Sequence, residues 1–237
     1  MSDRGYRRTE QTATLQAMPR PATVRPARRS ELPDAARLLA TSLGFAAEDA
    51  LPAWFMRTTD ELGGLTLVGV ADDAVVGVAY VIPARLHGDP MLFLPGLAVA
   101  PAVRRQGIAL ELMQELRRWA LKRGDTRICW TADPVNAPAL RLYLSRLGAL
   151  ITGYRPALHD GLRADPGHPL DDVDIEWRLN DRSTLDDRNL RRVEISPDDR
   201  RRVRREMSAL LADGYVGCAV DLERDAQCGT VHFARAA

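Results

Sequence analysis

The sequence predicts an α/β fold in which short apolar strands and amphipathic helices follow one another along most of the chain. Two observations carry this prediction. The first is an apolar run at 91–99 that passes through a glycine turn into an amphipathic segment at 107–122, which is typical of a strand, a tight turn and a helix. The second is a pair of apolar runs, 65–71 and 75–82, on either side of the turn residues 72–74, which is typical of a β-hairpin.

The chain is expected to begin with a mobile segment, followed by a strand and two helices. Residues 1–22 are rich in Arg, Thr, Gln and Pro and have no hydrophobic periodicity, so we expect them to be mobile. Residues 23–27 predict the first strand. Ser30 is a suitable N-cap for a helix that Gly44 ends, and a second helix is expected over 48–62, interrupted near its start by a proline.

The strand at 91–99 contains an irregular pair, Pro95 and Gly96. Because proline has no N–H to donate and glycine weakens a strand, we expect a bulge or a splay of the sheet there; a simple irregularity of a sheet edge is the alternative. The helix at 107–122 should end at Gly124. Its apolar stripe is predicted to be buried and consists of Leu112, Met113, Leu116, Trp119 and Ala120.

The second half of the chain predicts further alternation of strands and helices. The expected elements are a strand at 127–131, a helix at 136–148, strands at 150–154 and 173–179, a helix from Ser196 to Gly214, and a hairpin of 215–222 with 229–234. We divide the chain into a mobile segment (1–22), a main domain (23–180) and a C-terminal extension (181–237) of strand, helix and hairpin. The extension is expected to pack on the main domain or on a second subunit, as in a homodimer.

Composition argues against several classes of protein. With 33 Lys and Arg against 32 Asp and Glu, the formal net charge is +1, which disfavours a nucleic-acid-binding or membrane-surface protein. The arginines at 200–205 adjoin acidic residues, so they indicate a solvated helix face. Three cysteines without a CxxC pair indicate neither a disulfide framework nor a zinc site, and we expect no metal. Without a signal peptide or a membrane-spanning apolar run, we expect the protein to be cytoplasmic.

Residues 104–109, Arg-Arg-Gln-Gly-Ile-Ala, lie where the predicted strand passes into the predicted helix. The first turn of a helix has backbone N–H groups without an intrahelical partner, and the helix dipole adds partial positive charge there. Gly107 removes the side chain that would block a close approach, Ala109 keeps the next contact small, and Arg104 adds a cation. This loop is therefore predicted to bind a pyrophosphate.

A second motif follows, in which Asn136, Ala139 and Tyr143 stand in the pattern N-x-x-A-x-x-x-Y. In this order and separated by one strand, the two motifs resemble those of the GNAT superfamily of acyl-CoA-dependent N-acyltransferases. The resemblance implies acetyl-CoA or another acyl-CoA as co-substrate, and a mixed, mostly antiparallel sheet that is flanked by helices and splayed at its fourth and fifth strands. The W-T-x-D-P sequence at 130–134 and the D-G-L…E-W-R-L sequence within 160–179 also resemble a longer, poorly characterised GNAT subgroup.

The resemblance implies roles for individual residues. The backbone of Leu97, Ala98 and Val99 would bind the thioester and the pantetheine arm within the splay. Tyr143 would protonate the leaving thiolate, with a buried core aromatic as the alternative. Asn136 would hydrogen-bond to the pantetheine arm, and an N-cap of its own helix is an equal alternative. The residues implied to bind the pyrophosphate are Arg104, Arg105, Gln106, Gly107, Ile108 and Ala109.

A general base is not evident, because the strand at 91–99 has no ionisable residue. Asp133, at the end of the neighbouring strand, is the first candidate, with Glu111, His87 and His159 behind it; a water chain or an amine that arrives deprotonated are alternatives. The expected function is acyl transfer, foremost of acetyl, to the amine of a small molecule by direct attack in a ternary complex. The alternatives are a non-catalytic acyl-CoA-binding module, and a GNAT-fold enzyme that decarboxylates an acyl thioester or transfers an acyl group from a carrier protein.

Overall fold

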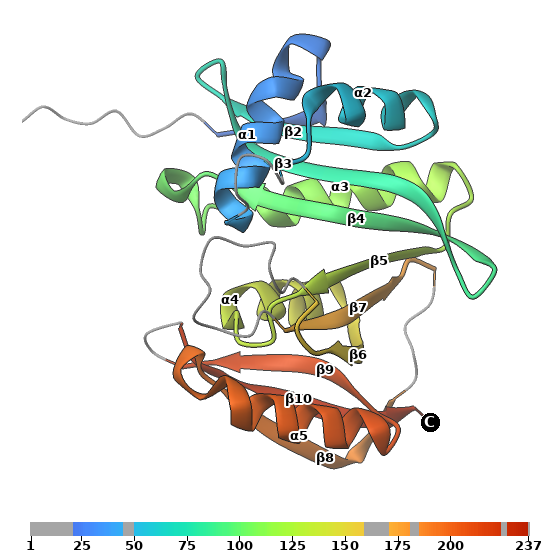
Figure 1. The fold of residues 1–237 in the computed structure, drawn as a ribbon, viewed down its shortest axis with the longest axis vertical. Helices are drawn as coiled ribbons and strands as arrows, with labels where there is room; N and C mark the ends of the chain where they lie inside the picture. Colours follow the sequence, from blue (N-terminus) through green and yellow to red (C-terminus); the bar gives the residue numbers. More distant parts are fainter. Residues whose placement is uncertain (1–20, 45–49, 159–170, 181–184, 224–226, 237) are drawn as a thin grey trace, which may run out of the picture.

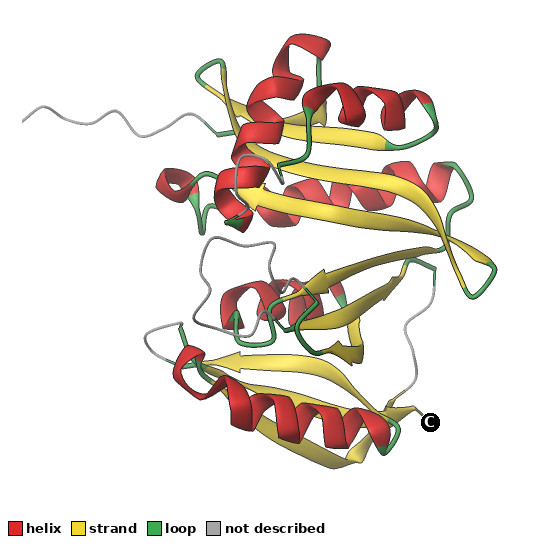
Figure 2. Ribbon diagram, viewed as in Figure 1, coloured by secondary structure: helices red, strands yellow, loops and turns green. Residues whose placement is uncertain are grey.

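The computed structural model describes residues 21–44, 50–158, 171–180, 185–223 and 227–236, so the predicted mobile segment lies almost entirely outside the described residues. Figures 1 and 2 show the arrangement of the elements. In chain order these are β1 (Thr23–Pro26), η1 (Arg29–Glu31), α1 (Leu32–Leu43), α2 (Ala53–Glu61), β2 (Leu65–Ala71), β3 (Ala74–Leu86), β4 (Asp89–Val99), η3 (Pro101–Val103), α3 (Ile108–Lys122), β5 (Arg127–Ala132), α4 (Ala137–Leu140), η4 (Arg141–Leu147), β6 (Leu150–Arg155), β7 (Asp172–Arg178), β8 (Leu185–Ile195), η5 (Pro197–Asp199), α5 (Arg200–Ala212), β9 (Tyr215–Leu222) and β10 (Gly229–Ala236).

Within the described part of the chain, ten strands form one mixed sheet in the order β1-β2-β3-β4-β5-β7-β6-β9-β10-β8. Neighbouring strands are antiparallel except β4 and β5, which are parallel. The long β3–β4 hairpin turns at His87 and Gly88, whose φ angles are 53° and 92°. Positive φ at both turn residues matches the right-handed twist of the flanking strands. This mostly antiparallel sheet with one parallel pair confirms the predicted fold class.

Helices cover both faces of the first part of the sheet (Figure 1). Successive residues of a strand point to opposite faces, so β2 and β3 contribute to two separate cores. Val68, Val78 and Tyr80 are buried together with α1 and α2. Leu67 and Ala79 are buried on the other face together with α3.

Helix α3 packs through the apolar stripe predicted from the sequence. The fully buried members of the stripe are Leu112, Met113, Leu116 and Ala120. Trp119 differs from the prediction, because it is only partly buried and the guanidinium of Arg123 lies 4.4 Å from its ring centroid. Gly124 follows the helix with a φ of 85°, the left-handed conformation that commonly ends a helix.

The C-terminal extension continues the sheet at its far side (Figure 1). β9 pairs with β6 at Ile151 and Gly217, where a Cβ on the glycine would lie 2.9 Å from the isoleucine side chain. Glycine therefore permits the close approach of the two strands. Ser145, on η4, adds a second link, because its hydroxyl accepts a hydrogen bond from the Val220 N–H at 2.9 Å and donates one to the Val220 carbonyl at 3.2 Å.

Helix α5 buries its apolar stripe against the same sheet. Val203 and Met207 are fully buried in the core that also holds the α3 stripe, and Leu210 and Leu211 pack partly buried against it. The expected strand, helix and hairpin are β8, α5 and the β9–β10 pair. One core runs through the main part of the chain and the extension, and the division at residue 180 stays a prediction.

Helix α2, the β3–β4 hairpin and the helix expected at 136–148 differ from the sequence-based expectation. Helix α2 begins at Ala53 rather than at residue 48, because Pro52 is extended and takes the N-cap position. β3 continues as far as Leu86, and β4 already begins at Asp89. Both strands are longer than expected because the polar residues at the end of the hairpin obscure the alternation that indicates a strand. The helix expected at 136–148 is a short α4 followed by the π-helical η4, and such widened turns occur often at functional sites.

Candidate functional site

β4 and β5 pair over only two positions before they diverge. Leu92 lies opposite Ile128 and Phe93 opposite Cys129, and the pairing ends there. On the other side of β4, Phe93 pairs with Ile82 and Gly96 pairs with Tyr80, so that Leu94 and Pro95 together oppose Val81 alone. Two residues against one is a β-bulge, which bends and twists its strand. The bulge predicted from Pro95 and Gly96 is confirmed, and the pairing of β4 with β5 ends where the bulge begins.

Gly96 also fixes how closely α1 approaches the bulge. A Cβ at this position would lie 2.6 Å from a side-chain carbon of Leu39, which is too short for any real contact. The glycine therefore permits α1 to pack directly on the bulged strand.

Beyond the bulge, β4 presents part of its backbone to the side from which β5 has departed. The Ala100 N–H donates to the Val76 carbonyl at 2.8 Å, so Ala98, two residues earlier, also turns its backbone groups toward β3. Leu97 and Val99 therefore turn theirs the other way, toward the open edge. Of the three residues implied by the resemblance, Leu97 offers both backbone groups to a ligand between the strands. Val99 offers its N–H, since its carbonyl accepts a hydrogen bond from Arg104, and Ala98 instead pairs with β3.

The residues between η3 and α3, 104–107, are exposed and end at the amino terminus of the helix. Gly107 occupies the N-cap with a φ of 89°, and a Cβ placed on it would have no heavy atom within 4 Å. Arg105 also has a positive φ, 66°, and Arg104 donates from Nε to the Val99 carbonyl at 3.1 Å. Ile108 is buried and anchors the helix start. The free N–H groups of the first turn and the two exposed guanidinium groups favour an anion here.

Asn136 caps the helix that follows β5. Its Oδ1 accepts a hydrogen bond from the Ala139 N–H at 3.2 Å, which is the N-cap geometry. The residue is exposed, and the cap uses only the oxygen of the amide. The amide N–H₂ group therefore remains to donate to a ligand, so the cap and the implied contact to a pantetheine arm are compatible.

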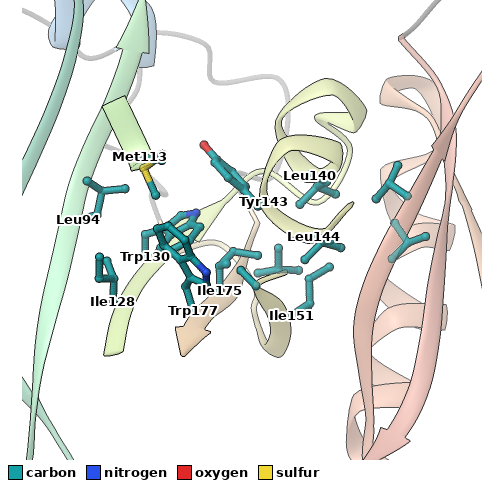
Figure 3. Close-up of a cluster of buried hydrophobic side chains, with 14 of the residues drawn as sticks. Leu94, Met113, Ile128, Trp130, Leu140, Tyr143, Leu144, Ile151, Ile175 and Trp177 are labelled. Atoms are coloured by element: carbon teal, nitrogen blue, oxygen red, sulfur yellow. The ribbon is translucent and has the colours of Figure 1, made fainter. Parts of the chain in front are cut away.

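Tyr143 lies on η4 at the edge of the main core, and its ring packs against Trp130 of β5. The ring centroids are 5.1 Å apart at 75°, an edge-to-face contact. Figure 3 shows the hydroxyl pointing away from the apolar cluster. Burial raises the pKa of Tyr143 to about 12. The hydroxyl is therefore protonated at neutral pH. Within the described residues it has no hydrogen-bond partner, so it is able to donate to a ligand.

Asp133, the first candidate for a general base, directly follows β5 and binds an arginine of the extension. Arg200 donates from both terminal nitrogens to the two carboxylate oxygens, at 2.9 and 2.8 Å. One of these oxygens also accepts from the Val135 N–H at 3.0 Å. Sequence reasoning missed Arg200, because nothing in the local pattern of the extension shows that α5 folds back to the end of β5.

The other base candidates lie elsewhere or outside the described residues. His87 forms the turn of the β3–β4 hairpin, ten residues along the strand from Leu97 and thus roughly 30 Å away at about 3.3 Å per residue. Glu111 is exposed in the first turn of α3. His159 lies outside the described residues. The hairpin thus places His87, a secondary candidate, at the opposite end of β4 from the open edge, as a turn residue.

Comparison with known protein families identifies the chain. Residues 33–149, about half of the chain, match the acetyltransferase (GNAT) family. The chain belongs to the GNAT family of acetyltransferases. The matched residues include the bulged β4, the glycine loop, α3, β5 and the helix that carries Tyr143. No protein with a curated description matches this GNAT chain in sequence.

Solved structures share the GNAT fold of this chain. A putative acetyltransferase from Salmonella typhimurium, solved with its cofactor acetyl-CoA, superposes with a TM-score of 0.57 at 19% identity and covers 70% of this chain and 98% of its own. A ribosomal-protein-alanine N-acetyltransferase from Brucella melitensis gives 0.56 at 22% identity, over 66% of this chain and 99% of its own. A GNAT family acetyltransferase from Elizabethkingia anophelis with acetyl-CoA bound gives 0.51 at 16% identity, over 66% and 97%. About a third of this chain lies outside each superposition.

Among the described helices, none has both the length and the apolar character needed to cross a membrane.

Proposed function

We propose that this GNAT protein transfers an acyl group, foremost acetyl, from acyl-CoA to the amine of a small molecule, by direct attack in a ternary complex. One observation carries the proposal: β4 and β5 separate at the bulge, and the free edge of β4 leads directly into the glycine loop of α3. The N–H groups at the edge of β4, which suit an amide chain, are therefore followed along the chain by those at the amino terminus of α3, which suit a pyrophosphate.

The residues of this structure fit acyl-CoA. Leu97 and Val99 offer backbone groups at the open edge of β4, and an amide chain pairs with such an edge as a further strand does. Residues 104–109 provide the N–H groups of the α3 amino terminus, and the space beside Gly107 is open. The exposed amide N–H₂ group of Asn136 provides one more donor.

Acyl-CoA supplies the thioester, whose carbonyl carbon is open to attack by a neutral amine. The N–H groups at the open edge of β4 stabilise the negative charge that develops on the carbonyl oxygen, because fixed donors need no reorganisation. As the C–N bond forms and the C–S bond breaks, the amine loses one proton and the sulfur gains one. The strands hold the two reactants in one cleft, which removes much of the entropic barrier.

Tyr143 stabilises the departing sulfur. Its pKa of about 12 lies above that of a thiol, about 8.5 for cysteine. The hydroxyl therefore donates a hydrogen bond to the thiolate, and the sulfur is neutralised by the proton that the amine releases. The hydroxyl is suited to this role because it has no other partner within the described part of the chain and points away from the core (Figure 3).

The amine reaches the site deprotonated or loses its proton to water in our proposal. β4 carries no ionisable residue between Leu92 and Val99, and both carboxylate oxygens of Asp133 are directed at Arg200. We assign Asp133 a structural task in place of proton abstraction. If Asp133 were the base, Asp133→Asn would change the way in which the rate of acyl transfer depends on pH. Our assignment predicts a lower rate with an unchanged pH dependence.

A screen for release of free CoA thiol from acetyl-CoA in the presence of an amine library tests the proposal. The library includes peptide amino termini, because the structurally similar Brucella protein is named as an N-acetyltransferase of a ribosomal protein. We expect thiol release that depends on one class of amine, with the acetylated amine formed in equal amount. Binding of acetyl-CoA without release for any amine would instead indicate a binding module. Turnover of malonyl-CoA or of a loaded carrier protein alone would indicate the other thioester reactions.

A further inference from the structure

Arg200, the first residue of α5, connects the C-terminal extension to the turn that follows β5. Its bidentate contact to Asp133 spans 67 positions of the sequence, and the two side chains are only 20% and 28% exposed. Two parallel N–H···O bonds fix the orientation of both groups as well as their distance.

The turn that Arg200 holds begins the helix of the site. The Asp133 carboxylate accepts from the Val135 N–H, and the Asp133 carbonyl accepts from the Asn136 N–H at 3.1 Å. Asn136 then caps α4, and η4 with Tyr143 follows without a break. Asp133 directly follows β5, and this strand carries Trp130, against which the Tyr143 ring packs. A shift of Asp133 would therefore displace both the start of the helix that carries Tyr143 and the strand whose Trp130 packs on the Tyr143 ring.

The helix itself gives no reason for a cation at this position. Arg200 lies in the first turn of α5, where the partial positive charge of the helix dipole disfavours another positive charge. The nearby acid Asp199 is already bound to Arg202 at 2.6 Å. The partner that compensates Arg200 is the turn after β5.

A second arginine of the same face binds α5 to the sheet. Arg204, one turn after Arg200, donates to both oxygens of Asp171, which is only 3% exposed. Tyr154 and the Ala157 N–H donate to the same carboxylate at 2.8 and 2.9 Å. Arg204 thus fixes the place of α5, and Arg200 extends from that fixed helix to Asp133.

We propose that Arg200 is a positioning residue for acyl transfer, which acts through Asp133 on Asn136 and Tyr143. The inference rests on the proposed function, and it assigns the C-terminal extension a task in the reaction. The helix of the extension would hold Tyr143, on the leaving-group side of the proposed site, in its active position.

The test compares Arg200→Gln with Arg202→Gln, two substitutions on the same helix that each remove a charge and several hydrogen bonds. Arg202 binds Asp199, Glu206 and the Glu194 carbonyl within the extension, so it controls for general damage to α5. The first measurement needs no activity: hydrogen exchange of the backbone amides of 133–147, followed by mass spectrometry. The second is kcat and KM of the amine-dependent thiol release.

We expect Arg200→Gln to speed exchange over 133–147 by roughly tenfold and to lower kcat by roughly 10- to 100-fold, the usual effect of a small misplacement. The KM for acetyl-CoA should change less than kcat, because Asn136 is only one of several donors to the CoA. Arg202→Gln should leave both exchange and kcat within about twofold of the parent protein. Arg200→Lys should restore part of kcat. Asp133→Asn should lower kcat as Arg200→Gln does, and the double variant no further, because both remove one contact.

Equal exchange and equal kcat ratios for the Arg200 and Arg202 variants would overturn the inference, as would additive losses in the double variant. Should Arg200→Gln fail to fold, Arg200→Lys and Asp133→Asn carry the same comparison. A parent protein without thiol release would refute the proposed function, and the exchange result would still decide whether Arg200 orders residues 133–147.

Discussion

Gly107 and Gly124 form a matched pair at the two ends of α3. Their φ angles are 89° and 85°, and a Cβ on either would have no heavy atom within 4 Å. Alanine at either position costs about 1–2 kcal/mol, since a left-handed conformation is unfavourable for a residue with a Cβ. For a chain of this length that lowers the Tm by roughly 2–8 °C, and equally for both variants. Only Gly107, however, lies in the loop proposed to bind a pyrophosphate.

Substitution by glutamate should affect the affinity for CoA very differently at the two glycines. Two unit charges 4 Å apart repel by about 1 kcal/mol in water and by about 4 kcal/mol at the effective dielectric constant of a protein surface. Gly107→Glu should therefore weaken binding of CoA by about 5- to 1,000-fold, since each 1.4 kcal/mol is about tenfold. Gly124→Glu should bind CoA as the parent protein does. The dipole favours an acid at the amino terminus of α3, so the Gly107 variant should be the more stable of the two.

Isothermal titration calorimetry with CoA, together with thermal unfolding of both variants, decides the matter. We expect the more stable glutamate variant, Gly107→Glu, to be the one with the weaker affinity for CoA. Equal affinity of the two folded variants for CoA would refute the assignment of the glycine loop. A loss of affinity that follows the loss of Tm in both variants would refute it as well.

Three further outcomes follow from the contacts around the site. Tyr143→Phe should leave the Tm and the acyl-CoA affinity nearly unchanged but lower turnover by about 10²–10³, the usual effect of losing one fixed hydrogen-bond donor. The pKa of about 12 predicts no loss of the parent's activity from tyrosine ionisation below about pH 11. Ser145→Ala should lower the free energy of unfolding by about 1–3 kcal/mol in denaturant titrations, because it deprives the buried backbone of Val220 of both hydrogen bonds. Burial opposes ionisation of Asp171, but hydrogen bonds led by that from Arg204 outweigh it and hold the pKa of the carboxyl below its usual value. Its ionised form therefore stabilises the fold above the unfolded pKa of about 3.9. The difference in the free energy of unfolding between the parent and Asp171→Asn should become smaller as the pH falls below that value, and a difference that does not change with pH would contradict this.

The sequence predicted those parts of the site that depend on local chemistry. Pro95 and Gly96 indicated the bulge because each disturbs a strand in its own way, and the structure places the bulge at Leu94 and Pro95. Gly107 and the apolar stripe of α3 indicated the helix start in the same manner. The roles of the loop and of Tyr143 stay predictions, which the structure makes testable by showing the open space beside Gly107 and the direction of the Tyr143 hydroxyl.

Features that depend on contacts between distant segments were not visible in the sequence. The ion pair of Asp133 with Arg200 joins residues on separate elements, and no periodicity records it. Ala98 lies in the implied pantetheine segment, yet only its register with β3 shows that its backbone is already paired. His87 is a plausible base by residue type alone, and the length of the hairpin places it far from the open edge of β4 at Leu97.

Amide hydrogen exchange of β4, measured by NMR with and without acetyl-CoA, tests the central claim most directly. The register predicts slow exchange for the Ala98 amide in the free protein and fast exchange for those of Leu97 and Val99. Saturating acetyl-CoA should slow the Leu97 and Val99 amides at least about tenfold and leave Ala98 unchanged, because the ligand takes the edge that β5 leaves open. Unchanged exchange at Leu97 and Val99 in the saturated protein would contradict the account.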